Sequence, residues 1–203
     1  MSARTTALRL IVIGGSAGAL DVMLELCAAL PDTLTTPIVI VLHLQASHIS
    51  LVPELLARTC RRPVREVEDK LALEAGTVYV APPNYHVLVE RGATLALSVD
   101  APVHYSRPSI DVLFETAADS FGAATLGVVL SGANEDGARG LARIHRAGGA
   151  AVVQDPATAL YPTMPTAALA AVGRGAQVLS IAELSSLFAR LDGGMNLHQD
   201  SLR

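Results

Sequence analysis

The segment from Leu10 to Leu20 constrains the fold more than any other part of the chain. It opens with the apolar run Leu-Ile-Val-Ile, three of whose residues are β-branched, and this run predicts a buried strand. Gly14-Gly15-Ser16-Ala17-Gly18 follows and fits the pattern G-x-S-x-G, which is typical of a sharp strand-to-helix turn that exposes a serine hydroxyl. The N–H groups at the start of such a helix are free to stabilise an anion.

Three roles are compatible with this turn: it can present Ser16 as a nucleophile, bind an anion or a nucleotide, or simply pack the helix on the strand. The dinucleotide-binding pattern G-x-G-x-x-G fails, because Ser16 stands in the place of its second glycine. The acidic residue expected about 20 or more residues further on is also missing. His43 stands there instead. The nucleophile is the favoured of the three roles.

Length and composition indicate a single globular protein. The chain has 203 residues, of which 51% are hydrophobic and 17% charged, and this composition excludes a disordered chain. We expect one domain over residues 1–195 and a frayed tail over residues 196–203. The net charge of −4 and the 3% aromatic content disfavour a nucleic-acid partner. No apolar run reaches about 18 residues and the N-terminus lacks a signal-peptide pattern, so we expect a cytoplasmic protein without membrane insertion.

Apolar runs alternate with amphipathic segments along most of the chain. This alternation predicts a doubly wound, mostly parallel α/β sheet of the Rossmann-like class. The expected parallel strands cover residues 10–13, 38–42, 64–67, 126–130, 150–154 and 177–179. The expected helices cover residues 19–30, 50–61, 109–121, 138–146, 166–172 and 181–191. Short strands at 78–81, 86–89 and 94–97, separated by turn residues, predict an antiparallel hairpin region attached to the parallel sheet.

Three residues with complementary chemistry follow expected strands. Ser16, His43 and Asp136 each lie beyond the carboxyl end of an apolar run, where parallel sheets place their functional loops. A serine hydroxyl needs a base to take its proton during attack, and an imidazole base needs a carboxylate to orient it. We therefore predict a Ser-His-Asp triad in this chain order, with Glu135 as the rival carboxylate.

Each of these residues also has a structural alternative. A histidine after a buried strand is often structural, and Asp136 precedes Gly137 and could cap the helix that follows. We expect His86 and His104 to have structural or surface roles, with contact to the substrate as the alternative. The sequence shows no metal-ligand spacing, so we predict no metal and no cofactor. It predicts no particular oligomeric state. Four arginines form a basic cluster that is either a solvated face or a docking surface for acidic helices: Arg58, Arg61, Arg62 and Arg65.

The chain resembles the catalytic domain of the chemotaxis receptor methylesterases, the CheB family. The matching segments run in family order over nearly the whole chain, and together they are highly specific. They are Ile13-Gly14-Gly15-Ser16-Ala17-Gly18, Leu42-His43-Leu44, Val78-Tyr79-Val80-Ala81-Pro82, Arg107-Pro108-Ser109-Ile110-Asp111-Val112-Leu113-Phe114, Leu130-Ser131-Gly132 with Asp136-Gly137-Ala138, and Met164-Pro165.

The resemblance implies a serine hydrolase that removes methyl groups from γ-glutamyl methyl esters of chemoreceptor-type proteins, and many members of the family also deamidate receptor glutamines. It implies Ser16 as nucleophile, His43 as base and Asp136 as the residue that orients the base. It also implies that the backbone N–H groups of Ala17 and Ala133 hold the oxyanion. We further expect Gly15 and Arg107 to line the substrate-binding cleft.

The chain departs from the family pattern in three places, none of which removes a triad member. Many relatives carry a phosphorylation-controlled receiver domain before the catalytic domain, and we expect none here because the first strand begins at about residue 9. Ala19 replaces a common glycine, and Ala133 replaces a bulkier residue. Two alternatives to the esterase stay open: a nucleotide-binding module that uses the same glycine-rich loop, and a non-catalytic signalling adaptor.

Overall fold

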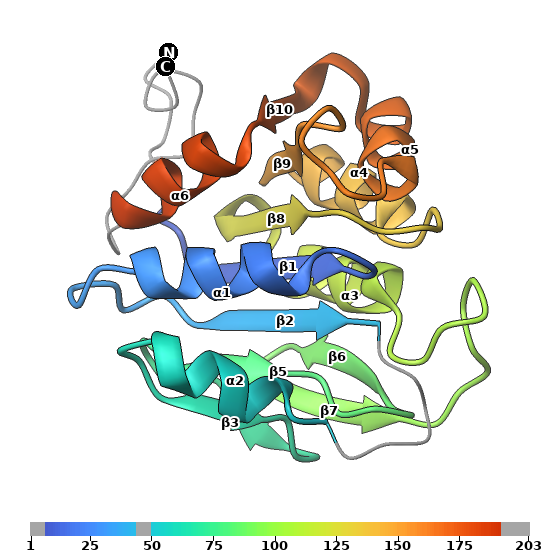
Figure 1. Ribbon diagram of the computed structural model, residues 1–203. Coiled ribbons are helices and arrows are strands. Elements are labelled where there is room, and N and C mark those ends of the chain that lie inside the picture. Colours follow the sequence, from blue (N-terminus) through green and yellow to red (C-terminus); the bar gives the residue numbers. More distant parts are fainter. Residues whose placement is uncertain (1–6, 44–49, 192–203) are drawn as a thin grey trace, which may run out of the picture.

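A computed structural model describes residues 7–43 and 50–191 of the chain. Its main sheet has seven parallel strands in the order β10-β9-β8-β1-β2-β5-β3, so that β1 is central (Figure 1). The strands are β1 (Leu10–Gly15), β2 (Ile38–Leu42), β3 (Val64–Glu66), β5 (Val78–Val80), β8 (Thr125–Val129), β9 (Ala150–Gln154) and β10 (Ala176–Leu179). The predicted doubly wound, mostly parallel α/β fold is confirmed.

Helices cover both faces of this sheet, which is why its central strands are apolar at every position. Alternate side chains of β1 enter two separate cores. Ile11 and Ile13 pack with α1, α2 and α6, whereas Leu10 and Val12 pack with α3, α4 and α5. The helices are α1 (Leu20–Ala29), α2 (Val52–Thr59), α3 (Ile110–Phe121), α4 (Ala138–Arg146), α5 (Thr163–Val172) and α6 (Ile181–Ala189).

The antiparallel region is a second, separate sheet. Strands β4 (Leu71–Ala72), β7 (Thr94–Ser98) and β6 (His86–Glu90) pair in that order. The segment 78–81, which we expected within this region, instead forms β5 of the parallel sheet, between β2 and β3. Its three residues are all buried, as a strand covered on both faces requires, whereas β6 and β7 each have partly exposed positions.

Element boundaries differ from the expected ones mainly at helix starts. Helix α5 begins at Thr163, three residues before the expected Thr166, because Pro165 fits the first turn of a helix, where its missing N–H costs no hydrogen bond. Helix α2 is shorter than expected at both ends. The expected tail over residues 196–203 lies outside the described residues. Among the described helices, none is long and apolar enough to cross a membrane.

The parallel register brings three strand ends to one edge of the sheet. Gly15 of β1 pairs with Leu42 of β2, and Gly14 pairs with Val129 of β8. Ser16 is the first residue after β1, and His43 is the first residue after β2. The loop that follows β8 leads to Asp136. The fold therefore assembles the three residues from segments that are far apart in the chain.

Candidate active site

Ser16 and His43 follow neighbouring strands and are joined through the backbone. The N–H of His43 donates to the carbonyl of Gly15 at 3.1 Å, and the N–H of Ser16 donates to the carbonyl of Ser131 at 2.9 Å. Gly15 is required by this packing, because a Cβ added there would lie 2.5 Å from the Cβ of Ala19. The turn after β1 is thus fixed on both sides, and Ser16 stays half-buried at its tip.

The His43 ring contacts a wholly buried carboxylate. Its Nε2 lies 2.9 Å from Oδ2 of Asp136. The same oxygen accepts the N–H of Ile110 at 2.7 Å, while Oδ1 accepts the hydroxyl of Ser109 at 2.9 Å and the N–H of Asp111 at 3.0 Å. Asp136 therefore sits at the N-terminus of α3, where free N–H groups and the helix dipole stabilise a negative charge.

These contacts decide the protonation of the pair. Burial alone would raise the pKa of Asp136, but the hydrogen bond from His43 and the N–H donors of Asp111 and Ile110 outweigh it, so the pKa lies below its ordinary value. An ionised carboxylate only accepts hydrogen bonds, so Nε2 of His43 carries the proton. In the neutral ring Nδ1 is then the nitrogen with a free lone pair, and it is the one able to act as a base.

The hydroxyl of Ser16 makes no hydrogen bond to any residue that the structure describes. Nδ1 of His43 instead lies 3.4 Å from the hydroxyl of Ser106. The structure therefore pairs His43 with Asp136 and places the Ser16 backbone beside them, without a bond between Ser16 and the ring. Hydrogen bonds of this kind often tighten only once substrate is bound.

Two backbone N–H groups beside Ser16 are free to bind a ligand. Those of Ala17 and Ala133 donate to nothing within residues 7–43 and 50–191, and both alanines are exposed. The loops that carry them are tied together, because the hydroxyl of Ser131 donates to the carbonyl of Ala17 at 2.8 Å. The N–H of Ser131 donates in turn to Oε1 of the buried Gln154 at 2.9 Å. Hydrogen bonds thus hold together the two loops that carry the free N–H groups.

Two residues that hold this arrangement, Ser106 and Gln154, were not predicted from the sequence, and Ser131 was named only within the segment Leu130-Ser131-Gly132, without a role. A signal existed for Gln154, since it is the one polar residue at the end of the apolar run Ala-Ala-Val-Val. No such signal marks Ser106, because it lies in an irregular loop whose position depends on tertiary contacts.

Arg107 braces the loop that precedes α3. Its Nη1 donates to the carbonyls of Val99 at 2.8 Å and Asp100 at 3.0 Å. Its Nε is buried and makes no hydrogen bond to the described residues. The hydrogen bonds of the Arg107 guanidinium therefore go to the loop backbone. A role for Arg107 in substrate binding stays a prediction.

Behind Asp136 lies a second buried carboxylate, that of Asp111. Burial, and to a lesser extent the nearby charge of Asp136, raise its pKa. Its Oδ2 lies 3.6 Å from Nε2 of His104 and 3.6 Å from Nε of Arg139. The ligand atoms of His104, Asp111 and Asp136 all lie within 4.8 Å of one another, but both oxygens of Asp136 already accept two hydrogen bonds each. The group is better described as an ion-pair cluster than as a metal site.

The structure also places His86 and the basic cluster of arginines that the sequence predicted. His86 is buried and structural: its Nδ1 accepts the N–H of Ser109 at 3.1 Å.

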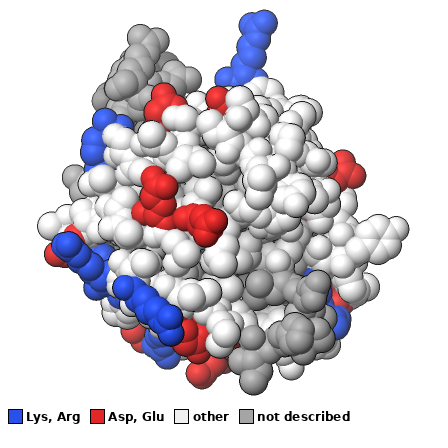
Figure 2. Space-filling view, in the orientation of Figure 1, with Lys and Arg blue, Asp and Glu red and all other residues white. Residues whose placement is uncertain are grey.

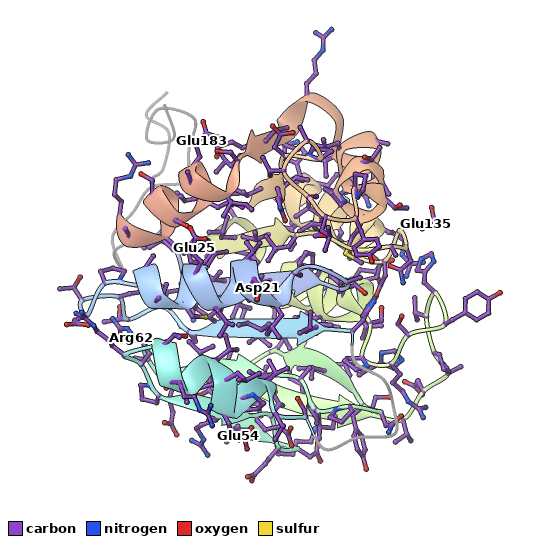
Figure 3. All side chains as sticks on the ribbon, viewed as in Figure 1. Asp21, Glu25, Glu54, Arg62, Glu135 and Glu183 are labelled. Carbon is purple, nitrogen blue, oxygen red and sulfur yellow. The ribbon has the colours of Figure 1, made fainter. Side chains whose placement is uncertain are left out.

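Arg62 donates to the carbonyl of Pro31, and Figure 3 places it at the end of the sheet opposite Glu135. Figure 2 shows basic side chains over the α2 region, apart from the acidic side chains over α1. The basic cluster therefore does not line the edge that carries Ser16.

This fold and site define a hydrolytic enzyme. One edge of the doubly wound α/β sheet carries the turn with Ser16, the His43–Asp136 pair and two free backbone N–H groups. The family model described as CheB methylesterase matches residues 11–188. The chain therefore belongs to the CheB methylesterase family, and the resemblance predicted from the sequence is confirmed.

Relatives and a solved structure agree with this assignment. A protein of Leptospira interrogans is 46% identical over 189 residues, which cover 93% of this chain and 97% of that protein. The protein-glutamate methylesterase/protein-glutamine glutaminase of Maricaulis maris is 32% identical over 189 residues. These residues cover 91% of this chain and 47% of the Maricaulis maris protein. The crystal structure of the Thermotoga maritima CheB methylesterase catalytic domain matches the fold with a TM-score of 0.82 at 24% identity, covering 91% of this chain and 98% of that one.

Proposed function

We propose that this protein hydrolyses the γ-methyl esters of glutamyl side chains in chemoreceptor-type proteins, with Ser16 as nucleophile, His43 as base and Asp136 as the residue that orients the base. The observation that carries the proposal is the His43–Asp136 contact of 2.9 Å beside the Ser16 turn. The name of the Maricaulis maris relative supplies the methylated glutamate, and the resemblance to the chemotaxis receptor methylesterases supplies the chemoreceptor-type protein that carries it.

The proposed reaction begins with attack by the Ser16 hydroxyl on the ester carbonyl. Nδ1 of His43 takes the hydroxyl proton, and Asp136 stabilises the resulting imidazolium through Nε2. The N–H groups of Ala17 and Ala133 stabilise the oxyanion, because they have no other partner in the described structure. Collapse of the intermediate transfers the proton to the leaving methoxide and releases methanol.

Water completes the cycle. Neutral His43 takes a proton from a water molecule, which attacks the acyl group on Ser16, and collapse of this second intermediate returns the proton from His43 to Ser16 and releases glutamate. The same steps applied to a glutamine side chain would release ammonia. Deamidation is therefore a second activity to test on this site.

A fluorophosphonate probe tests the nucleophile directly. We expect wild type to be labelled at Ser16 and Ser16→Ala to stay unlabelled, while Ser120→Ala, whose hydroxyl bonds the carbonyl of Val89, is labelled like wild type. Equal labelling of Ser16→Ala would refute the assignment. Methanol release from a methylated chemoreceptor fragment, compared with release from a simple methyl ester, then tests the substrate class.

A further inference from the structure

The free lone pair of His43 has one hydrogen-bond partner in the part of the chain that the structure describes. This partner is the hydroxyl of Ser106, 3.4 Å from Nδ1. Because Nε2 donates to the ionised Asp136, Nδ1 can only accept, and Ser106 is the donor in this contact. The carbonyl of His104 also lies 3.4 Å from the hydroxyl, so the single proton of Ser106 is shared between these two acceptors. Ser106 thus contacts the same nitrogen that must receive the proton of Ser16 in the proposed reaction.

The backbone that carries Ser106 is held in place without help from His43. Ser106 and Val103 exchange two backbone hydrogen bonds, of 2.8 and 3.1 Å, across a tight turn. The two central residues, His104 and Tyr105, have φ angles of 47° and 61°, as in type I′ turns. Residues other than glycine adopt such angles only where the surrounding structure enforces them.

Contacts outside the turn supply this enforcement. The side chain of Arg107 holds two carbonyls at the other end of the loop, and its own carbonyl accepts the N–H of Asn84 at 3.2 Å. His104 lies 3.6 Å from Asp111. The carbonyl of Ala101 in the same loop lies 3.2 Å from Nε2 of His86 in β6. The Ser106 hydroxyl is therefore presented to His43 by a loop that contacts β6 through Ala101 and α3 through His104.

A hydroxyl suits this place because it can both donate and accept. Ser106 can donate to Nδ1 of the neutral ring and accept from Nδ1–H once the ring is protonated. At 3.4 Å the bond is longer than the usual O–H contact and weaker than the bond to Asp136, so the hydroxyl of Ser16 or a leaving group can displace it. Ser106 can thus orient the ring without blocking it.

We propose that Ser106 is a positioning residue, which holds the His43 ring through Nδ1 so that Nε2 stays on Asp136 and Nδ1 stays the basic nitrogen. The inference rests on the proposed esterase for its kinetic consequence. Its structural part, the orientation and tautomer of one ring, can be measured without any turnover.

The test compares four variants of the whole chain. Ser106→Ala removes the hydroxyl, Ser106→Cys keeps the size but donates only weakly, and Ser106→Thr keeps the hydroxyl. Ser98→Ala is the control, because Ser98, the last residue of β7, bonds Asp100 at the start of the loop at 2.7 Å and makes no hydrogen bond to His43. Ester hydrolysis gives kcat and KM, and nitrogen-15 NMR of the imidazole gives the tautomer of His43.

We expect Ser106→Ala and Ser106→Cys to lower kcat about 3–10-fold, the size of effect of one modest hydrogen bond, with KM within about twofold. In both variants the Nδ1 resonance moves and the population with the proton on Nε2 falls. Ser106→Thr and Ser98→Ala keep wild-type values in both measurements.

Three results would overturn the proposal: an unchanged Nδ1 resonance in Ser106→Ala, a rise in its kcat, or the same loss in Ser98→Ala. The spectroscopic arm separates this inference from the proposed function. If wild type hydrolyses no ester while Ser106→Ala still moves the Nδ1 resonance, the esterase is refuted and the Ser106–His43 contact stands.

Discussion

Asp136 and Asp111 cap each other's helices. Oδ1 of Asp136 accepts the N–H of Asp111 at 3.0 Å, in the first turn of α3. Oδ1 of Asp111 accepts the N–H groups of Gly137 at 3.0 Å and Gly140 at 2.7 Å, at the start of α4. Our structural alternative for Asp136, a cap on the helix that follows it, was therefore wrong: it caps α3, and Asp111 caps α4.

This exchange predicts unequal losses of stability for two substitutions of Asp111. Asp111→Ala leaves two buried N–H groups without an acceptor, so we expect a loss of about 2–4 kcal/mol in the free energy of unfolding. Asp111→Asn keeps an acceptor and replaces a carboxyl whose pKa is raised by burial, so we expect a much smaller loss in the free energy of unfolding. Urea denaturation at neutral pH measures both, and equal losses would contradict the capping role.

The lowered pKa of Asp136 predicts a pH dependence of stability. A carboxyl whose pKa is lower in the folded than in the unfolded state stabilises the fold above its unfolded pKa, about 3.9, and loses this contribution as the pH falls through the folded pKa. The stability difference between wild type and Asp136→Asn should shrink as the pH falls below about 4, through the folded pKa of Asp136. Thermal melts across this range test the sign, and a difference that grows in acid would contradict it.

Activity should depend strongly on both His43 and Asp136. We expect His43→Ala to lower kcat for ester hydrolysis roughly 10³-fold or more, because the proton of Ser16 then has no base. Asp136→Asn should lower kcat about 10²–10⁴-fold, because an amide no longer fixes the proton on Nε2. Steady-state kinetics measure both losses, and Glu135→Gln is the control for the neighbouring exposed carboxylate. A comparable loss in Glu135→Gln would favour Glu135 as the carboxylate partner.

Gly18 combines two constraints that can be separated by mutation. Its φ is 77°, and a Cβ there would lie 2.7 Å from the Cβ of Leu160. Gly173→Ala tests backbone strain without crowding, because Gly173 has a φ of 72° and a ψ of −143°, a combination essentially restricted to glycine, and nothing lies within 4 Å of an added Cβ. We expect Gly173→Ala to cost about 1–3 kcal/mol of backbone strain and Gly18→Ala to add the cost of the contact with Leu160.

Leu160→Gly in the Gly18→Ala background removes the Cβ that lies 2.7 Å from the added methyl group, so it should recover part of the excess loss and leave the backbone part. The free energy of unfolding of the single and double variants measures this coupling. Additive losses would show that Leu160 does not restrict the turn that carries Ser16.

Much of the architecture could be predicted because it rests on short-range patterns. The buried runs at Leu10 and Ile38, and the glycine-rich turn around Ser16, encode strand, turn and helix within a few residues of one another. The side of the sheet on which functional loops gather also follows from the parallel topology. The catalytic roles of Ser16, His43 and Asp136 stay predictions, while their placement at one edge agrees with the expected topology.

Long-range contacts could not be predicted in the same way. The short segment at Val78 joined the parallel sheet because its burial on both faces was decided by β2, β3 and the packed helices. Likewise, nothing near Ser106 in the chain shows that it will meet a histidine 63 residues earlier.

Local periodicity thus specified the strands, the turns and the serine at the first strand end, since backbone preferences and apolar spacing act over a few residues. Partners separated by long stretches of chain, such as Asp111 and Gly137, 26 residues apart, were settled by packing, because the helix that a buried carboxylate caps depends on which N–H groups the completed fold leaves unpaired.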